Sequence, residues 1–218
     1  MIDSTKPIDD ATPYHDLSGL KLPKNKTYTL SDIYIKEAEN IAIATLKYLS
    51  APPSKKEASF SYNWLLKLHE EMFGNVWDWA GKLRHNELSI GIKAYLVPME
   101  LKKLVDDLAF WVKHKTYDHY EIAARIHHRA VFIHPFSNGN GRWSRMLANI
   151  YLRQNGLMPV KWQENLLAKE NPKRNDYIQA LKKADQSDFS DLISMLRLTM
   201  KLLVAFLKRS SLRLVILI

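Results

Sequence analysis

HPFSNGNGRWSR, residues 134–145, is the stretch around which this 218-residue chain is organised. Gly139 and Gly141 flank Asn140, so the backbone there carries little bulk and can adopt positive φ angles. Successive backbone N–H groups in such a turn form a concavity that binds anions. A helix that begins at the turn adds the positive end of its dipole. The stretch therefore predicts a phosphate site at the N-terminus of a helix.

Two arginines and a histidine give this turn its chemistry. Arg142 and Arg145 are three residues apart and share one face of the predicted helix. Cations there oppose the helix dipole, and a bound di- or triphosphate would reverse that cost. His134 is the one group in the stretch that can move a proton near neutral pH. A lone histidine is more often a satisfied core or capping residue, but the convergence of these groups favours a general base.

The stretch resembles the signature of the Fic (filamentation-induced) family, His-Pro-Phe-x-acid-Gly-Asn-Gly-Arg-x-x-Arg. Eight positions match, namely His134, Pro135, Phe136, Gly139, Asn140, Gly141, Arg142 and Arg145. The family usually has Asp or Glu where this chain has Asn138, and in the family that carboxylate holds Mg²⁺. An amide oxygen can ligate a hard cation without supplying negative charge. Asn138 is therefore the candidate metal ligand, and Mg²⁺ affinity is the property that this departure affects.

The resemblance implies a nucleotidyltransferase that moves AMP from ATP to a hydroxyl side chain of a target protein. By position, His134 is the general base, Asn140 with the Gly139–Gly141 backbone holds the α-phosphate, and Arg142 and Arg145 hold the β- and γ-phosphates. ATP as co-substrate and Mg²⁺ are the implied cofactors. Doc-type kinases of the family depart from the motif at two positions that this chain keeps, which favours AMP transfer. A Fic-type phosphotransferase and a weakened or silent binding module are the alternatives.

The fold class that we predict is all-α, a Fic-like helical bundle with one small β-hairpin flap. We divide the chain into an amino-terminal arm (1–28), a Fic-like domain (29–195) and a basic amphipathic carboxy-terminal helix or tail (196–218). Part of the arm, ATPYHDLSGLKLP, resembles the bacterial Fic subgroup called mobile mystery protein B. Apolar spacing and capping residues predict helices over 31–50, 59–73, 98–115, 118–133, 142–154 and 172–184.

Residues 82–97 have the two-residue period of an extended segment. Leu88, Ile90 and Ile92 alternate with Ser89, Gly91 and Lys93, which predicts a short hairpin that ends before Pro98. In Fic proteins the equivalent segment is a flap that binds the backbone of the target by strand addition. The resemblance therefore assigns target binding to Leu88, Ser89, Ile90 and Gly91. A purely structural hairpin is the alternative.

The helix over 31–50 contains IKEAEN, residues 35–40. Fic proteins commonly inhibit themselves through Ser/Thr-x-x-x-Glu-Gly/Asn, whose glutamate pairs with the second motif arginine. Glu39 and Asn40 match the end of this pattern, whereas Ile35 does not match its Ser/Thr position. The resemblance implies an inhibitory Glu39–Arg145 ion pair, and an ordinary exposed glutamate is the alternative.

Two further pairs of residues have weaker signals. His127 and His128 are adjacent on a predicted helix and point about 100° apart, so we interpret them as structural and not as metal ligands. Arg174 and Tyr177 lie in a segment that resembles the stretch after the Fic motif, where they would line the nucleotide pocket.

The composition narrows the function classes. The chain has no cysteine, which excludes disulfides and thiolate metal sites, and its net charge is +9. We interpret that charge as a basic surface and expect neither nucleic acid nor membrane as a partner. With no secretory signal at its start and no apolar span, we expect the chain in the cytoplasm. The expected partner is a protein with an acceptor hydroxyl, and an antitoxin or a homo-oligomer remains open.

Overall fold

The computed structural model describes residues 17, 19–23, 25–162 and 172–197, and this part of the chain is all-α, as predicted. Its named helices are α1 (Leu30–Leu49), α2 (Tyr62–Phe73), the short 3₁₀ helix η1 (Ala94–Leu96), α3 (Val97–His114), α4 (His119–Ile133), α5 (Asn140–Gln154) and α7 (Pro172–Asp185). Residues 190–197 are also helical. Among the described helices, none combines the length and the apolar character needed to cross a bilayer. Most of the predicted arm and tail lies outside the described residues.

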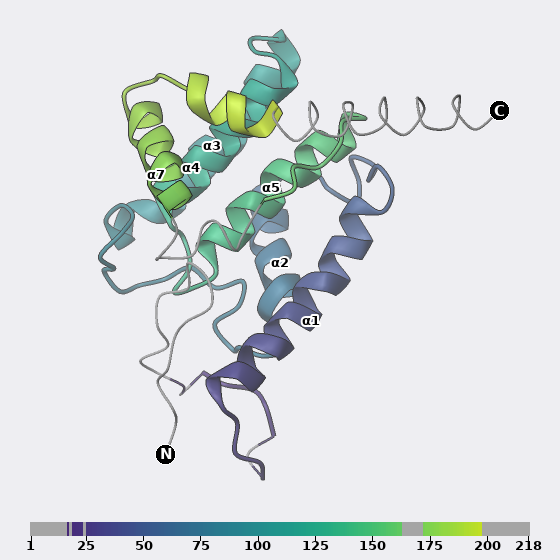
Figure 1. Ribbon diagram of the computed structural model, residues 1–218, viewed down its shortest axis with the longest axis vertical. Coiled ribbons are helices and arrows are strands. Elements are labelled where there is room, and N and C mark those ends of the chain that lie inside the picture. The colour runs from purple at the N-terminus through teal and green to yellow at the C-terminus, as the bar shows by residue number, and fades with distance from the viewer. Residues whose placement is uncertain (1–16, 18, 24, 163–171, 198–218) are drawn as a thin grey trace, which may run out of the picture.

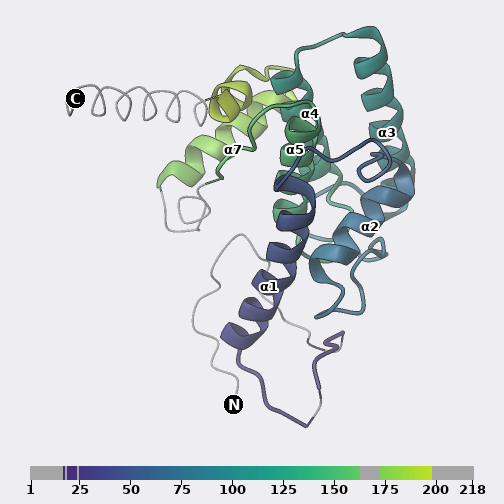
Figure 2. The same ribbon diagram turned by 90° about the vertical axis from the view of Figure 1, so that its right-hand side faces the viewer.

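The helices α4 and α5 form the central pair of the bundle (Figure 1). On one side α1 packs against α2 and α5, and on the other α3 packs against α4 (Figure 2). The loop between α4 and α5 carries the first half of the motif, and α5 carries the second half. The fold therefore places the motif where the two central helices meet their neighbours.

Side-chain caps set where the helices begin. The Thr29 hydroxyl accepts from the Asp32 N–H while the Asp32 carboxylate accepts from the Thr29 N–H, which closes a capping box at α1. Asp118 caps α4 by accepting from the Glu121 N–H at 3.0 Å, which confirms the predicted start of that helix. The Glu121 carboxylate does not complete a box there, because it pairs with Arg125 at 2.8 Å.

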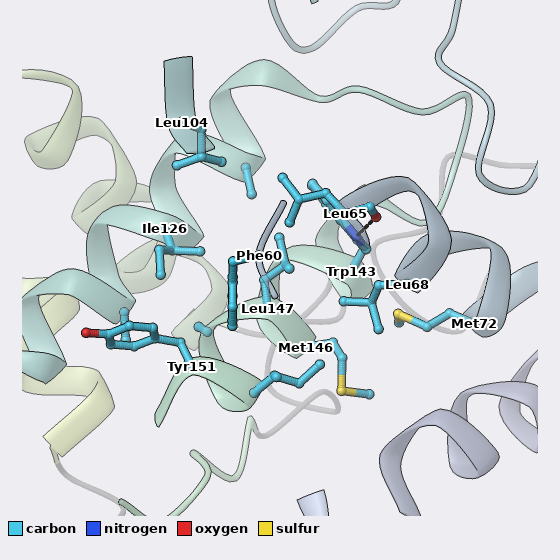
Figure 3. Close-up of a cluster of buried hydrophobic side chains, with 14 of the residues drawn as sticks. Phe60, Leu65, Leu68, Met72, Leu104, Ile126, Trp143, Met146, Leu147 and Tyr151 are labelled. Atoms are coloured by element: carbon cyan, nitrogen blue, oxygen red, sulfur yellow. Dashed lines mark hydrogen bonds between the residues drawn. The ribbon is translucent and has the colours of Figure 1, made fainter. Parts of the chain in front are cut away.

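A closely packed apolar cluster fixes the register of α5 (Figure 3). Trp143, directly after Arg142, is fully buried and donates its indole N–H to the Leu65 carbonyl of α2. Burial of one large apolar side chain is worth about 1.5–3 kcal/mol, so many such contacts oppose any rotation of the helix. The remaining labelled members come from the 60–72 segment and from α3, α4 and α5: Phe60, Leu68, Met72, Leu104, Ile126, Met146, Leu147 and Tyr151.

The predicted hairpin does not form, because residues 82–97 contain no strand. Residues 82–93 are an irregular loop in which the buried Arg84 guanidinium forms hydrogen bonds to backbone carbonyl groups. It donates to three carbonyl oxygens, those of Asn86, Ile92 and His134. Gly91 bends the loop further with a φ of +100°. Two backbone carbonyl groups of the segment, those of Asn86 and Ile92, are thus bonded to one side chain and not to a partner strand.

Candidate active site

His134 is the C-cap of α4 and has a left-handed backbone, with φ 51° and ψ 61°. Pro135 follows and disfavours further helix, so the chain turns out of α4 at this point. The Nδ1 atom of His134 lies 3.3 Å from the Val131 carbonyl oxygen, which can only accept. Nδ1 therefore carries the proton, and Nε2 keeps the lone pair that a general base needs.

The environment of His134 keeps its ring neutral. Burial is the main cause that lowers its pKa from 6.5 to about 4, and the positive charge of Arg84 is a smaller cause in the same direction. The hydrogen bond to Val131 acts in the opposite direction. At neutral pH the ring is therefore almost entirely in its basic form.

The N-terminus of α5 is the place for which the sequence predicts an anion cradle. Gly139 is the N-cap with φ 76°, and the first backbone bond inside the helix runs from the Trp143 N–H to the Gly139 carbonyl at 2.9 Å. Helix geometry gives the N–H groups of Asn140, Gly141 and Arg142 no carbonyl partner within α5. These donors, with the dipole behind them, suit a phosphate group.

The Asn140 side chain bonds the backbone of the motif loop. Its Oδ1 accepts from the Phe136 N–H at 2.9 Å, and its Nδ2 donates to the Phe136 carbonyl at 2.8 Å. The amide thereby holds the shape of the loop, and its Nδ2 keeps a second hydrogen for another acceptor. The predicted contact of Asn140 with a phosphate group remains a prediction.

The surroundings of Asn138 do not suit a metal ligand. Its side chain is buried, and Oδ1 accepts from the Gly139 N–H at 2.6 Å. Among the described residues there is no group of three or more His, Cys, Asp or Glu side chains that could hold a metal ion. The residues present therefore do not fit an Mg²⁺ ion held by the protein at this position.

Arg142 pairs with a glutamate of α1, in an ion pair that the sequence did not predict. Its Nη1 lies 2.6 Å from the Glu37 Oε2, and Glu37 is fully buried. The other carboxylate oxygen of Glu37 accepts from the Trp77 indole N–H at 2.5 Å. The Arg142 guanidinium also stacks 4.7 Å above the Phe73 ring.

The predicted Glu39–Arg145 pair is absent, because Glu39 lies on the exposed side of α1 and pairs with Lys36 at 2.8 Å. Asn40 is on the buried side, where its Oδ1 accepts from Asn75 at 2.7 Å. The helical period explains the error, since residues 37 and 40 share the inner face of α1 and residue 39 does not.

Arg145 is 2% exposed and lies deeper than Arg142. The pKa of His127 is lowered to about 3, first by the burial of His127 itself and second by the charge of Arg145. His127 Nε2 in turn lies 2.9 Å from the Tyr177 hydroxyl, which α7 contributes. His127 and His128 are thus structural, as predicted, with His128 bonded to Asp185 at 2.8 Å. Arg174 is half-buried near the start of α7.

The family model of the Fic/DOC family matches residues 59–152. This chain carries a Fic domain. A protein of Aedes aegypti named protein adenylyltransferase Fic is 30% identical over 155 residues, which are 69% of this chain and 30% of that protein. The chain spans only 34% and 30% of the first two curated relatives that it matches.

Solved structures share the same fold. A Fic-1 fragment from C. elegans superposes with a TM-score of 0.65 and 24% identity, covering 87% of this chain and 55% of that one. The N-terminal Fic domain of a cell filamentation protein from Bartonella quintana, solved with bound ADP, superposes with a TM-score of 0.59 and 20% identity. That alignment covers 85% of this chain and 92% of the other, so it includes nearly all of a domain that binds a nucleotide.

In this Fic domain the four predicted target-binding residues lie in the loop after Arg84. Leu88 is half-buried, while Ser89, Ile90 and Gly91 are exposed. A Cβ atom on Gly91 would come within 2.5 Å of the His134 Cβ. The loop therefore reaches the base directly, although it is not a strand.

Sequence reasoning missed three residues of the site: Glu37, Arg84 and His69. Glu37 had a usable signal, because it follows Ile33 by four residues on the apolar face of α1. A charged residue on a buried helix face calls for a partner. Arg84 and His69 had no comparable signal, since they act on backbone groups distant in sequence.

Proposed function

We propose that this Fic domain transfers AMP from ATP to a hydroxyl side chain of a protein. The observation that carries the proposal is the position of the neutral Nε2 of His134, directly before the anion cradle and the arginines of α5. A base next to a polyphosphate site is the arrangement that nucleotidyl transfer needs.

In the proposed reaction the hydroxyl oxygen of the target attacks the α-phosphorus, and His134 Nε2 accepts the hydroxyl proton. The bond between the α-phosphorus and the bridging oxygen to the β-phosphate breaks, and pyrophosphate leaves. The N–H groups at the start of α5 hold phosphate oxygens, while Arg142 and Arg145 neutralise the charge on the leaving group. No step is assigned to a metal held by the protein, because Asn138 does not fit that role.

A pocket beside His134 suits the nucleoside. Its volume is about 250 Å³, and its walls include Gly91 of the loop, Val131 and Phe132 of α4, and Leu181 and Asp185 of α7. Apolar walls suit the faces of a purine ring, and the Asp185 carboxylate can accept from an amino group of the base. Since Gly91 also lies beside His134, the purine and the reacting phosphate would lie on neighbouring parts of one surface.

The exposed residues of the loop, Ser89 to Gly91, are the proposed contact with the target protein. Their position beside His134 would bring the acceptor hydroxyl to Nε2. A cytoplasmic location, where ATP is available, and the division of the chain into arm, domain and tail remain predictions from sequence.

We further propose that α1 restrains the reaction through Glu37. Its carboxylate occupies the Arg142 guanidinium that would otherwise hold a phosphate. Displacement of α1 would free that arginine. A regulatory partner, whether an antitoxin or a second copy of the chain, would find exposed apolar side chains on the outer face of this helix, namely Ile35, Ile43 and Leu46.

A silent or weakened binding module is the second candidate, favoured by the missing carboxylate at Asn138. It would bind ATP through the same cradle without transferring AMP. Phosphotransfer is a third outcome, which the retained motif positions disfavour.

Label transfer in a cell extract separates these candidates. The wild-type protein and His134→Ala would be given ATP labelled at the α- or the γ-phosphate. The proposal predicts α-label on protein, reduced about 10²–10⁴-fold in His134→Ala. The γ-label alone would establish phosphotransfer, and ATP binding with no label would establish the silent module.

Glu37 and Glu39 provide a matched pair for the restraint. Glu37→Gln removes the charge opposite Arg142, and we expect a gain in labelling of about tenfold, within the usual range of coupling between sites. Glu39→Gln changes the same charge on the exposed face of the same helix and should leave labelling unchanged. Equal labelling of the two variants would exclude the restraint.

A further inference from the structure

His69 of α2 is a fully buried polar residue to which the proposed reaction gives no role. Its ring stacks on the Phe136 ring of the motif with a centroid distance of 3.6 Å and an interplanar angle of 10°. Phe73, one turn further along α2, lies 4.8 Å from the same histidine ring. A polar ring packed this tightly between aromatic groups must have its nitrogen atoms satisfied.

Both nitrogen atoms of His69 have backbone partners. The Gly81 N–H donates to Nδ1 at 3.0 Å, and since an N–H can only donate, Nδ1 must be the accepting nitrogen. The proton therefore sits on Nε2, which lies 3.1 Å from the Asn138 carbonyl oxygen and donates to it. Burial lowers the pKa of His69 to about 3, so this neutral tautomer persists at physiological pH.

The contact with Asn138 acts on the peptide unit that opens the anion cradle. The C=O of Asn138 and the N–H of Gly139 belong to one planar group and point in opposite directions. His69 holds the carbonyl end, and the Asn138 side chain holds the N–H end at 2.6 Å. The orientation of this plane determines where the next N–H groups of α5 point.

Helix α2 also limits the space around Gly139. A Cβ atom there would lie 2.7 Å from the Phe73 ring and 3.2 Å from the His69 Nε2. The Phe73 ring in turn packs against the Arg142 guanidinium, which lies 4.7 Å from the ring centroid. Two residues one turn apart on α2 thus contact the carbonyl before the cradle, the N-cap glycine and one phosphate-binding arginine.

We propose that His69 is a positioning residue for the phosphate-binding N-terminus of α5, acting through its Nε2–H···O bond to the Asn138 carbonyl. It touches neither nucleotide nor target, and its effect reaches the ligand through the peptide plane between residues 138 and 139. The role rests on the proposed function only in that the bound anion is the triphosphate of ATP.

Two substitutions of His69 test its two hydrogen bonds separately. In His69→Gln the terminal amide nitrogen can replace Nε2 as donor to Asn138, while the bond from Gly81 is lost. In His69→Asn the shorter amide can accept from Gly81, but it cannot reach Asn138. Both variants remove the stacked ring, so each is a control for lost packing in the other.

The measurement is ATP affinity by calorimetry, together with the melting temperature of each variant. We expect His69→Asn to weaken ATP binding at least tenfold, and His69→Gln to remain within about threefold of the wild type at a similar loss of melting temperature. Equal ATP affinities in the two variants would overturn the positioning role and leave a structural one. A wild type that binds ATP without transferring AMP would refute the proposed function, and the comparison of affinities would still decide the role of His69.

If either variant does not fold, the wild-type protein still gives an answer. The ¹⁵N signal of His69 should report a proton on Nε2, and its shift should change when ATP saturates the cradle. A protonated Nδ1, or a signal that ATP does not affect, would exclude the proposed path to the cradle.

Discussion

The two loops that flank His134 are held in opposite ways. The motif loop before α5 is fixed at nearly every peptide, by Asn138 and Asn140 from within and by His69 from α2. The loop over 82–93 has the Arg84 guanidinium as its main side-chain anchor, with two further bonds from the Arg84 N–H to the Pro135 carbonyl and from the Ala94 N–H to the Glu87 carboxylate, and its tip is exposed. The proposed phosphate side of the site is thus preorganised, while the proposed target side can adjust.

This difference has a physical reason. A triphosphate presents the same geometry in every reaction cycle, so rigid donors bind it with little reorganisation. A protein target presents a side chain on a larger surface, and a loop with few anchors can adapt to it at low energetic cost. The comparison can be tested by weakening both loops together and then each one alone.

Acid should weaken both loops and give the largest effect on stability. The pKa values of His69 and His127 lie near 3 and that of His134 near 4, whereas the unfolded chain has 6.5. The unfolded state therefore binds more protons below pH 6.5, and stability falls as the pH drops through the interval between 6.5 and 4. Each histidine contributes about 1.4 kcal/mol per pH unit there, or about 4 kcal/mol for the three.

Urea unfolding at several pH values between 7 and 5 measures this slope. His134→Gln should reduce the slope by up to about 1.4 kcal/mol per pH unit, because one titrating group is removed. A free energy of unfolding that stays level over this interval would mean that these rings are not buried in neutral form.

Gly139→Ala should disrupt the rigid loop alone. The positive φ and the contact with Phe73 predict a loss of about 2–4 kcal/mol in stability and at least tenfold in ATP affinity. Gly156→Ala is the control, because it has a similar φ of +75° but no neighbour within 4 Å. It should cost about 1 kcal/mol and leave ATP binding intact. ATP affinity that is the same in both alanine variants would contradict a preorganised cradle.

Arg84→Met should loosen the adjustable loop. It removes three hydrogen bonds to backbone carbonyl groups while keeping the length of the side chain. We expect transfer to protein to fall about tenfold, with ATP affinity within about threefold of wild type. The pKa of His134 should rise, because the charge that lowers it is removed. Lys82→Met, an exposed change in the same loop, is the control for both measurements, which are transfer kinetics and calorimetry.

Asn138→Asp should have the smallest effect. The aspartate can keep the bond from the Gly139 N–H, and its second oxygen adds the charge that a hard cation prefers. We expect the Mg²⁺ concentration for half-maximal transfer to fall about fivefold, with little change in stability. Asn155→Asp, at the other end of α5, adds the same charge away from the site. An identical Mg²⁺ dependence in both variants would place any bound metal elsewhere.

The sequence was sufficient for the helices and for the motif. Apolar spacing and capping residues placed the helix ends within a few positions, because these signals are local. His134, the glycines and the two arginines of the motif meet in space because they are consecutive on one loop and one helix.

Contacts between distant segments were harder to predict. The two-residue period of residues 82–97 did not show that Arg84 would bond the backbone of its own loop. The choice of Glu39 over Glu37 followed a motif spacing, whereas the buried face of α1 decides which carboxylate faces inward. The task of the Asn140 side chain also depends on the fold of its loop, which residue types alone do not reveal.

The bond between Trp77 and Glu37 has a practical consequence. The indole of Trp77 is 1% exposed, donates to the carboxylate that faces Arg142, and stacks 5.2 Å from Trp79. Because indole fluorescence responds to a charge at its N–H, departure of α1 from the site would change the emission of this residue. Trp77, one of six tryptophans in the chain, is therefore an intrinsic reporter of whether α1 occupies the proposed site, and it needs no attached label.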